Sequence, residues 1–257
     1  MSPVPPHDPL PVTVVVPCCD EEPALARLAE ALARLETELA PAYAPAFLLI
    51  DDGSRDGTWA AMQRLFAARP GYRLLRHSSN RGLAAAIRTG LEAAVTEMVC
   101  SLDADCTYEP SQLTRLLPLL GPDVDLITAS PYHPDGRVVG VPGWRLFLSR
   151  GLSRLYALVL EHRLHTYTSC FRVYRRASVL PLPVRQSGFL GVAELLGRLD
   201  LAGGRIVECP AVLTSRRQGR SKMRVLRTIL GHLWLLAAFA IERWRRGRAR
   251  GADAGRS

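Results

Sequence analysis

Several common sequence features are missing from this chain of 257 residues. None of its six cysteines forms a Cys-x-x-Cys pair or has the spacing of a zinc site, so the thiols are expected to be reduced and buried. The N-terminus has neither a basic segment nor an apolar segment after it. No secretion signal is therefore predicted, and the cytoplasm is the expected compartment.

The sequence also lacks an apolar run that is long enough to cross a bilayer. A helix is predicted from Met223 to about Arg246, and its apolar stretch of about 14 residues is shorter than the roughly 20 that a transmembrane helix needs. Arginines flank this stretch, and it carries Trp234, with Trp244 beyond it. The helix either lies on an anionic membrane surface or packs against the core before a solvated basic tail. The first interpretation is favoured because arginines cluster at the end of an apolar helix.

Lysine is almost absent, since Lys222 is the only lysine among 33 basic residues. The net charge of +9 is concentrated at the C-terminal end, where the residues from Arg216 onward carry twelve basic side chains and two acidic ones. Such an end can bind nucleic acid or an anionic membrane surface. No nucleic-acid-binding module surrounds these basic residues, so the membrane is the expected partner and nucleic acid is not.

The chemistry that is present lies where predicted strands end. Three apolar runs each lead into acidic residues: 12–16 before Asp20-Glu21-Glu22, 47–50 before Asp51-Asp52, and 98–102 before Asp103-Ala104-Asp105. In an open α/β sheet, ligands bind at the carboxyl ends of the strands. Three strands that present acids at one edge therefore predict a ligand site there.

The pair Asp103 and Asp105 indicates which ligand this is. Two aspartates separated by one residue can share one hard divalent cation, which in turn neutralises a diphosphate. A nucleotide-sugar site is therefore the first hypothesis, although Asp-x-Asp alone is equally typical of a solvated turn. No Ser/His/Asp or Cys/His arrangement for nucleophilic catalysis is visible, and none of the six histidines is assigned a catalytic role.

Strands and helices alternate through the first half of the chain, which predicts an α/β fold with a mostly parallel sheet and right-handed crossovers. The expected strands are 12–16, 47–50, 73–76, 98–102 and 126–130, and the expected helices are 23–38, 58–68, 83–94 and 111–120. The second half is expected to supply the acceptor side. It contains a loop over 131–144, a helix over 145–164, a strand near 173–174, a helix over 193–201 and a strand over 205–209.

Six motifs follow one another in an order that resembles a known family. They are Val15-Val16-Pro17-Cys18-Cys19-Asp20-Glu21, Ile50-Asp51-Asp52-Gly53-Ser54-Arg55-Asp56-Gly57-Thr58, Asn80-Arg81-Gly82-Leu83, Leu102-Asp103-Ala104-Asp105, Thr168-Ser169-Cys170-Phe171-Arg172 and Arg216-Arg217-Gln218-Gly219-Arg220-Ser221-Lys222. The chain resembles family-2 glycosyltransferases of the dolichyl- or polyprenyl-phosphate mannosyltransferase type, which have a GT-A fold. The resemblance implies a transferase domain over 12–222, followed by an amphipathic helix and basic tail over 223–257.

The resemblance also implies roles for individual residues. The residues expected to bind the nucleotide sugar are Pro17, Cys19, Glu21, Ile50, Asp52, Asp103, Ala104 and Asp105. Asp103 and Asp105 are expected to hold Mg²⁺ or Mn²⁺, with Asp105 as the more direct ligand, and Thr107 occupies the position of a metal-assisting glutamine. Arg145, Arg216 and Lys222 correspond to positions that contact the phosphates of donor and acceptor, and join the two aspartates as the expected catalytic residues.

The implied reaction is an inverting transfer of a hexose to a polyprenyl phosphate at the cytoplasmic face of the membrane. The first expectation is mannose from GDP-mannose. A lipid phosphate is already anionic, so positioning and cationic groups suffice without a strong general base. Pro131, Thr166 and Cys170 depart from the family pattern near the phosphates. The alternatives are therefore UDP-glucose as the donor, another acceptor, or a non-catalytic subunit that binds a nucleotide. The enzyme hypothesis predicts that deletion after Arg224 removes membrane association but leaves turnover on a soluble acceptor.

Overall fold

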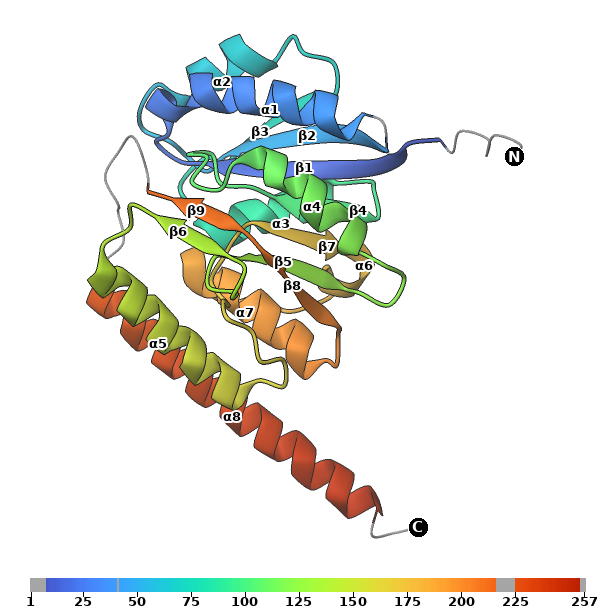
Figure 1. Cartoon of the computed structure of the whole chain (residues 1–257), viewed down its shortest axis with the longest axis vertical. Helices are drawn as coiled ribbons and strands as arrows, with labels where there is room; N and C mark the ends of the chain where they lie inside the picture. The colour runs from blue at the N-terminus through green and yellow to red at the C-terminus, as the bar shows by residue number, and fades with distance from the viewer. Residues whose placement is uncertain (1–7, 41, 216–224, 255–257) are drawn as a thin grey trace.

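The centre of the molecule is a seven-stranded sheet with the order β3-β2-β1-β4-β7-β5-β8, in a computed structural model that describes residues 8–40, 42–215 and 225–254 (Figure 1). Its strands are β1 (Leu10–Cys18), β2 (Tyr43–Asp51), β3 (Tyr72–Arg76), β4 (Met98–Ser101), β5 (Leu126–Ser130), β7 (Arg172–Arg175) and β8 (Ile206–Pro210). Strand β7 runs antiparallel to both of its neighbours, β4 and β5. The other neighbouring pairs are parallel, so the predicted mostly parallel sheet is confirmed.

Alternate residues of β1 divide the core into two layers. Val12, Val14 and Val16 pack in a cluster with α1 (Leu25–Leu39) and α2 (Thr58–Phe66). Val15 points to the opposite face and packs with α3 (Leu83–Ala93) and α7 (Gly188–Leu201). A run of valines that is buried on both faces is typical of a central parallel strand with helices on each side.

The register brings the predicted acidic strand ends to one edge. In the β1–β2 pair Cys18 lies opposite Asp51, and in the β1–β4 pair Val15 lies opposite Ser101. The loops that follow these three neighbouring strands therefore emerge at the same side of the sheet, where open α/β sheets bind their ligands.

One predicted α-helix is shorter than expected, and one predicted loop contains a strand. The stretch 111–120 contains only α4 (Leu113–Leu116), between the 3₁₀ turns η2 (Pro110–Gln112) and η3 (Leu117–Leu119), because Pro118 cannot continue the α-helical hydrogen bonding. The predicted loop 131–144 contains β6 (Arg137–Val139), which pairs with β9 (Val212–Thr214) in a separate two-stranded sheet.

Two helices cross one end of the molecule side by side, α5 (Gly143–Val159) and α8 (Val225–Ala254) (Figure 1). Helix α5 ends before the predicted residue 164, because the carboxylate of Asp200 accepts hydrogen bonds from the backbone N–H groups of Glu161 and His162 and holds the chain in a loop. The short helix α6 (Arg176–Val179) follows β7.

Helix α8 is divided between a buried and an exposed face. Leu235, Leu236 and Phe239 are buried in the core cluster of α7, whereas Trp234 and Trp244 are exposed. The buried side chains are those expected of a helix that packs against the core, and the exposed tryptophans are those expected of a helix that lies on a membrane surface. Among the described residues, no helix is long and apolar enough to cross a membrane.

Candidate nucleotide-sugar site

The acidic turn after β4 directs every second side chain toward a cavity. Asp103, Asp105 and Thr107 line this cavity, while Ala104 and Cys106 between them are buried in the core. The backbone N–H of Thr107 donates to Oδ1 of Asp105 at 3.0 Å, which orients that carboxylate. Two carboxylates therefore lie on one wall, as a shared divalent cation requires.

The thiol of Cys170 is a direct neighbour of Asp103. Its Sγ donates a hydrogen bond to Oδ1 of Asp103 at 2.6 Å. Burial and the Asp103 charge raise the pKa of the Cys170 thiol well above its ordinary value, so the thiol keeps its proton and remains a donor. On the adjacent residue, the ring of Phe171 stacks on Tyr108 at 5.4 Å between centroids. These contacts attach the 166–171 loop to the acidic turn.

The cavity has a volume of about 350 Å³, and both polar and apolar residues line it. Its polar residues include Asp103, Asp105, Thr107, Arg145, Thr166 and Thr168, and its apolar residues include Trp144, Leu148, Leu152, Phe189 and Ile229. Most of these apolar residues lie on α5, while α7 contributes Phe189 and α8 contributes Ile229. Such a cavity can hold a ligand with a charged head and an apolar chain.

His232 of α8 connects the two helices at the cavity wall. Its Nδ1 lies 2.7 Å from the hydroxyl of Tyr156 on α5, and the ring is 1% exposed. Burial lowers the pKa of His232 from 6.5 to about 4, so the imidazole is uncharged at neutral pH. Helix α8 is therefore part of the cavity rather than an appendage to it.

The carboxylate of Asp52, at the end of β2, is buried and accepts three hydrogen bonds. His77 Nδ1 and the N–H of Arg81 bind Oδ1, at 2.7 and 2.9 Å, and the N–H of Gly82 donates to Oδ2 at 2.7 Å. Its neighbour Asp51 is also buried, 2.9 Å from Nε of Arg76. The two aspartates thus tie the end of β3 and the loop after it to the end of β2.

The loop after β1 is shaped around Asp20, whose φ is +51°. Aspartate is among the few residues that adopt this left-handed conformation readily. Its N–H donates to Oγ of Ser54, and its Oδ1 accepts the N–H of Arg55 at 2.7 Å.

The structure places the predicted residues in three groups. Asp103, Asp105, Thr107 and Arg145 line one cavity, whereas Cys19, Glu21 and Asp52 lie at the neighbouring ends of β1 and β2. The side chains of Pro17, Ile50 and Ala104 are buried, which leaves mainly their backbone groups for contact with a ligand. Arg216 and Lys222 lie outside the described residues. Within the described part of the chain, no three His, Cys, Asp or Glu side chains cluster as metal ligands.

Two histidines that lie at these sites have no predicted role from the sequence. His77 follows β3 at the same edge as the acidic loops, so the strand-end argument that finds Asp52 and Asp103 would also have found it. His232 is a polar residue within an apolar helical run, and that irregularity was its only signal.

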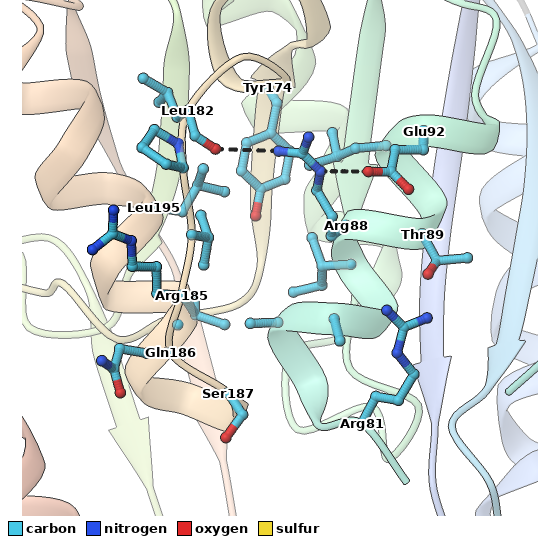
Figure 2. A pocket seen from close by; sticks show the side chains of 18 residues that line it. Arg81, Arg88, Thr89, Glu92, Tyr174, Leu182, Arg185, Gln186, Ser187 and Leu195 are labelled. Atoms are coloured by element: carbon cyan, nitrogen blue, oxygen red, sulfur yellow. Dashed lines mark hydrogen bonds and ion pairs between the residues drawn. The ribbon is translucent and has the colours of Figure 1, made fainter. Parts of the chain in front are cut away.

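A second cleft of about 490 Å³ lies between α3 and the segment that leads into α7 (Figure 2). Arg88 spans it, with Nη1 donating to the carbonyl of Leu182 at 3.2 Å and Nε donating to Glu92 at 2.7 Å (Figure 2). The residues of the acidic turn are not among those that line it. The cleft is thus separate from the cavity that holds Asp103 and Asp105.

Comparison with known proteins gives consistent matches. The sequence model of glycosyl transferase family 2 matches residues 13–180. A polyprenol monophosphomannose synthase from Mycolicibacterium smegmatis is 32% identical over 183 residues, which cover 68% of this chain and 69% of that protein.

Two solved structures have the same overall fold. Glucosyl-3-phosphoglycerate synthase from Mycobacterium tuberculosis, in complex with Mn²⁺, UDP and its product, has a TM-score of 0.65 at 18% identity and covers 91% of this chain and 80% of that one. A mannosyltransferase from Pyrobaculum calidifontis, in complex with GDP-Man and Mn²⁺, has a TM-score of 0.62 at 21% identity and covers 94% of this chain and 66% of that one.

Proposed function

Because this chain belongs to glycosyl transferase family 2, we propose that it transfers mannose from GDP-mannose, with inversion, to a polyprenyl phosphate. The observation that carries this proposal is the juxtaposition of Asp103 and Asp105 with apolar residues in one cavity. A polyprenyl phosphate has the matching chemistry, an anionic head on an apolar chain. The M. smegmatis relative is named as a polyprenol monophosphomannose synthase, which supports the same class of acceptor.

The donor set fits a divalent cation such as Mg²⁺ or Mn²⁺. Magnesium commonly takes one or two protein carboxylates and completes its shell with water and substrate phosphates, and Asp103 and Asp105 supply two. When bound, the cation would neutralise the diphosphate and the charge that develops on the departing nucleotide. Within the described residues, the chain itself offers no third acidic, histidine or cysteine ligand at this place.

The residues around the cation orient the reacting groups. The N–H of Thr107 holds the Asp105 carboxylate, and the Cys170 thiol holds that of Asp103, so both remain aligned without substrate. Arg145 on α5 lines the same cavity and would attract the acceptor phosphate. The phosphate oxygen is already a nucleophile, so catalysis consists of positioning and charge stabilisation. The resemblance assigns the remaining phosphate contacts to Arg216 and Lys222.

The outer faces of α5 and α8 would bring this cavity to the membrane. Exposed apolar side chains cover both helices: Trp144, Phe147, Leu148, Leu155 and Leu158 on α5, and Leu230, Leu233, Trp234, Ile241 and Trp244 on α8. Trp144 and Leu148 are exposed and also line the cavity, so the apolar surface continues into it. Arginines accompany these residues and would bind anionic lipids at the cytoplasmic face.

Replacing Trp234 by glutamate is expected to weaken binding to vesicles that contain phosphatidylglycerol by about tenfold, because an exposed apolar anchor becomes an anionic side chain. Sedimentation with the vesicles measures the bound fraction. Val95→Glu is the matched control, since Val95 is also exposed but lies between α3 and β4, away from the two helices. Equal losses in both variants would show that the surface of α5 and α8 is not the docking face.

The reaction itself is tested with radiolabelled GDP-mannose and UDP-glucose, each supplied with polyprenyl phosphate and Mn²⁺ or Mg²⁺. The expected result is metal-dependent label in the lipid from GDP-mannose. Label from UDP-glucose would show that the donor is UDP-glucose. Nucleotide release without labelled lipid would show that the acceptor is not a polyprenyl phosphate. Nucleotide binding without release from either donor would support a non-catalytic subunit instead.

A further inference from the structure

The loop after β3 carries a histidine to which the mechanism above gives no role. His77 follows Arg76, which lies opposite Asp51 in the β2–β3 register, so His77 emerges beside Asp52 at the carboxyl edge of the sheet. Its backbone N–H donates to the carbonyl of Asp51 at 2.8 Å. The imidazole is thereby fixed next to a residue that is expected to bind the nucleotide.

The imidazole connects α3 with the end of β2. Nδ1 lies 2.7 Å from Oδ1 of Asp52, and Nε2 lies 2.9 Å from the hydroxyl of Thr89 on α3. A carboxylate only accepts hydrogen bonds, so Nδ1 carries the proton in this pair. The ring is 8% exposed, and both of its nitrogens are bonded.

Asp52 in turn holds the rest of the loop. Arg81 and Gly82 donate their N–H groups to its two oxygens, so three of the roughly four acceptor positions of the carboxylate are used inside the protein. One position remains for a donor group of a ligand, and its direction depends on the bonds that fix the other three. His77 supplies the only side-chain bond among those three.

The same loop borders the space that a nucleotide would occupy. Asn80 donates to Sγ of Cys19 in the loop after β1 at 2.9 Å. An open hollow of about 680 Å³ lies between residues 76–80 and residues 53–55. At the other end of the loop, a Cβ on Gly82 would lie 2.8 Å from the N atom of Gly188, so the loop has little room to shift.

We propose that His77 is a positioning residue of the donor site, which aligns the Asp52 carboxylate and the 77–82 loop for the nucleotide of the sugar donor. The proposal rests on the proposed function, because it takes the donor to be a nucleotide sugar. His77 acts through Asp52 and does not contact the reacting atoms. Its loss should therefore weaken nucleotide binding more than it slows the transfer step.

Three variants test this assignment in the full-length protein. His77→Asn places an amide N–H close to the position of Nδ1, His77→Leu removes both ring nitrogens, and Thr89→Val removes only the second bond. His162→Leu is the matched control, since His162 forms a similar 2.7 Å pair with Asp200 away from the donor loops. The measurements are the Kd for GDP and UDP with Mn²⁺ by calorimetry, the melting temperature, and KM and kcat for the donor.

His77→Leu is expected to raise the nucleotide Kd and the donor KM by about tenfold, with kcat changed less than about threefold. His77→Asn should restore the Kd to within about threefold of the original, and Thr89→Val should give a smaller increase than leucine. His162→Leu should lower the melting temperature without changing the Kd.

A different pattern would overturn the proposal. If His77→Leu and His77→Asn lower the melting temperature together and leave the Kd unchanged, His77 has a structural role only. The proposal also fails if the parent protein binds nucleotide and neither variant at position 77 changes the Kd or the melting temperature, because His77 then has no measurable role. If the parent protein itself binds neither GDP nor UDP, the proposed function fails first, and this inference fails with it.

Discussion

Asp105→Asn is expected to reduce sugar transfer by at least about a hundredfold at a physiological concentration of Mg²⁺. Asparagine keeps the size of the side chain and an oxygen for the N–H of Thr107, but it removes one of the two negative charges that would hold the cation. Initial rates measured over a range of Mn²⁺ and Mg²⁺ concentrations check this. The metal concentration needed for half-maximal rate should rise, and a chelator should abolish the activity of the parent protein.

The control for this variant is Asp123→Asn. Asp123 is an exposed acid just before β5, at the opposite edge of the sheet from the acidic turn. It should leave both the rate and the metal requirement unchanged. If Asp105→Asn kept the parent rate at every metal concentration, the acidic turn would not be the cation site.

Phe239→Ala is expected to lower the free energy of unfolding by about 3–5 kcal/mol, which is the usual cost of removing a buried phenyl group. Phe239 is 1% exposed, and its ring packs so closely on α7 that a Cβ at Gly197 would lie 2.3 Å from it. Urea unfolding followed by circular dichroism measures the change. Deletion after residue 224 should have the larger effect, because it also removes Leu235 and Leu236 from the core.

Trp234→Ala is the matched control on the same helix, since Trp234 is 63% exposed. Its free energy of unfolding should stay within about 0.5 kcal/mol of the parent value, while its binding to vesicles falls. Residual turnover on a soluble acceptor after deletion of α8, as the sequence analysis expects, would contradict the role of α8 in the core and in the cavity wall. Similar destabilisation by both substitutions would contradict the division of the helix into two faces.

The first half of the fold was predictable because it follows local rules. The apolar runs at 12–16, 47–50 and 98–102 belong to the buried strands β1, β2 and β4, and acids follow each run directly or within four residues. Periodicity and strand-end chemistry therefore identify both the parallel sheet and its ligand edge. The motifs at 15–21, 50–58 and 102–105 lie at the ends of these strands, and together with the later motifs they made the GT-A fold and the family predictable.

The remaining features depend on contacts between distant residues. Strands β6 and β9 have three residues each and are separated by more than seventy positions, so neither has a periodicity of its own. The early end of α5 depends on Asp200, which lies on another helix. The pair of Tyr156 and His232 joins α5 to α8, and no local pattern in either helix indicates it.

Under the proposed function, the continuity between the exposed faces of α5 and α8 and the cavity has a consequence for how the acceptor would be found. Trp144 and Leu148 belong to both surfaces, so a lipid phosphate that diffuses laterally in one leaflet would reach Asp105 without passing through bulk water. The search would then take place in two dimensions. The rate would follow the mole fraction of the acceptor within the bilayer, and adding inert lipid at a constant total amount of acceptor would dilute the substrate.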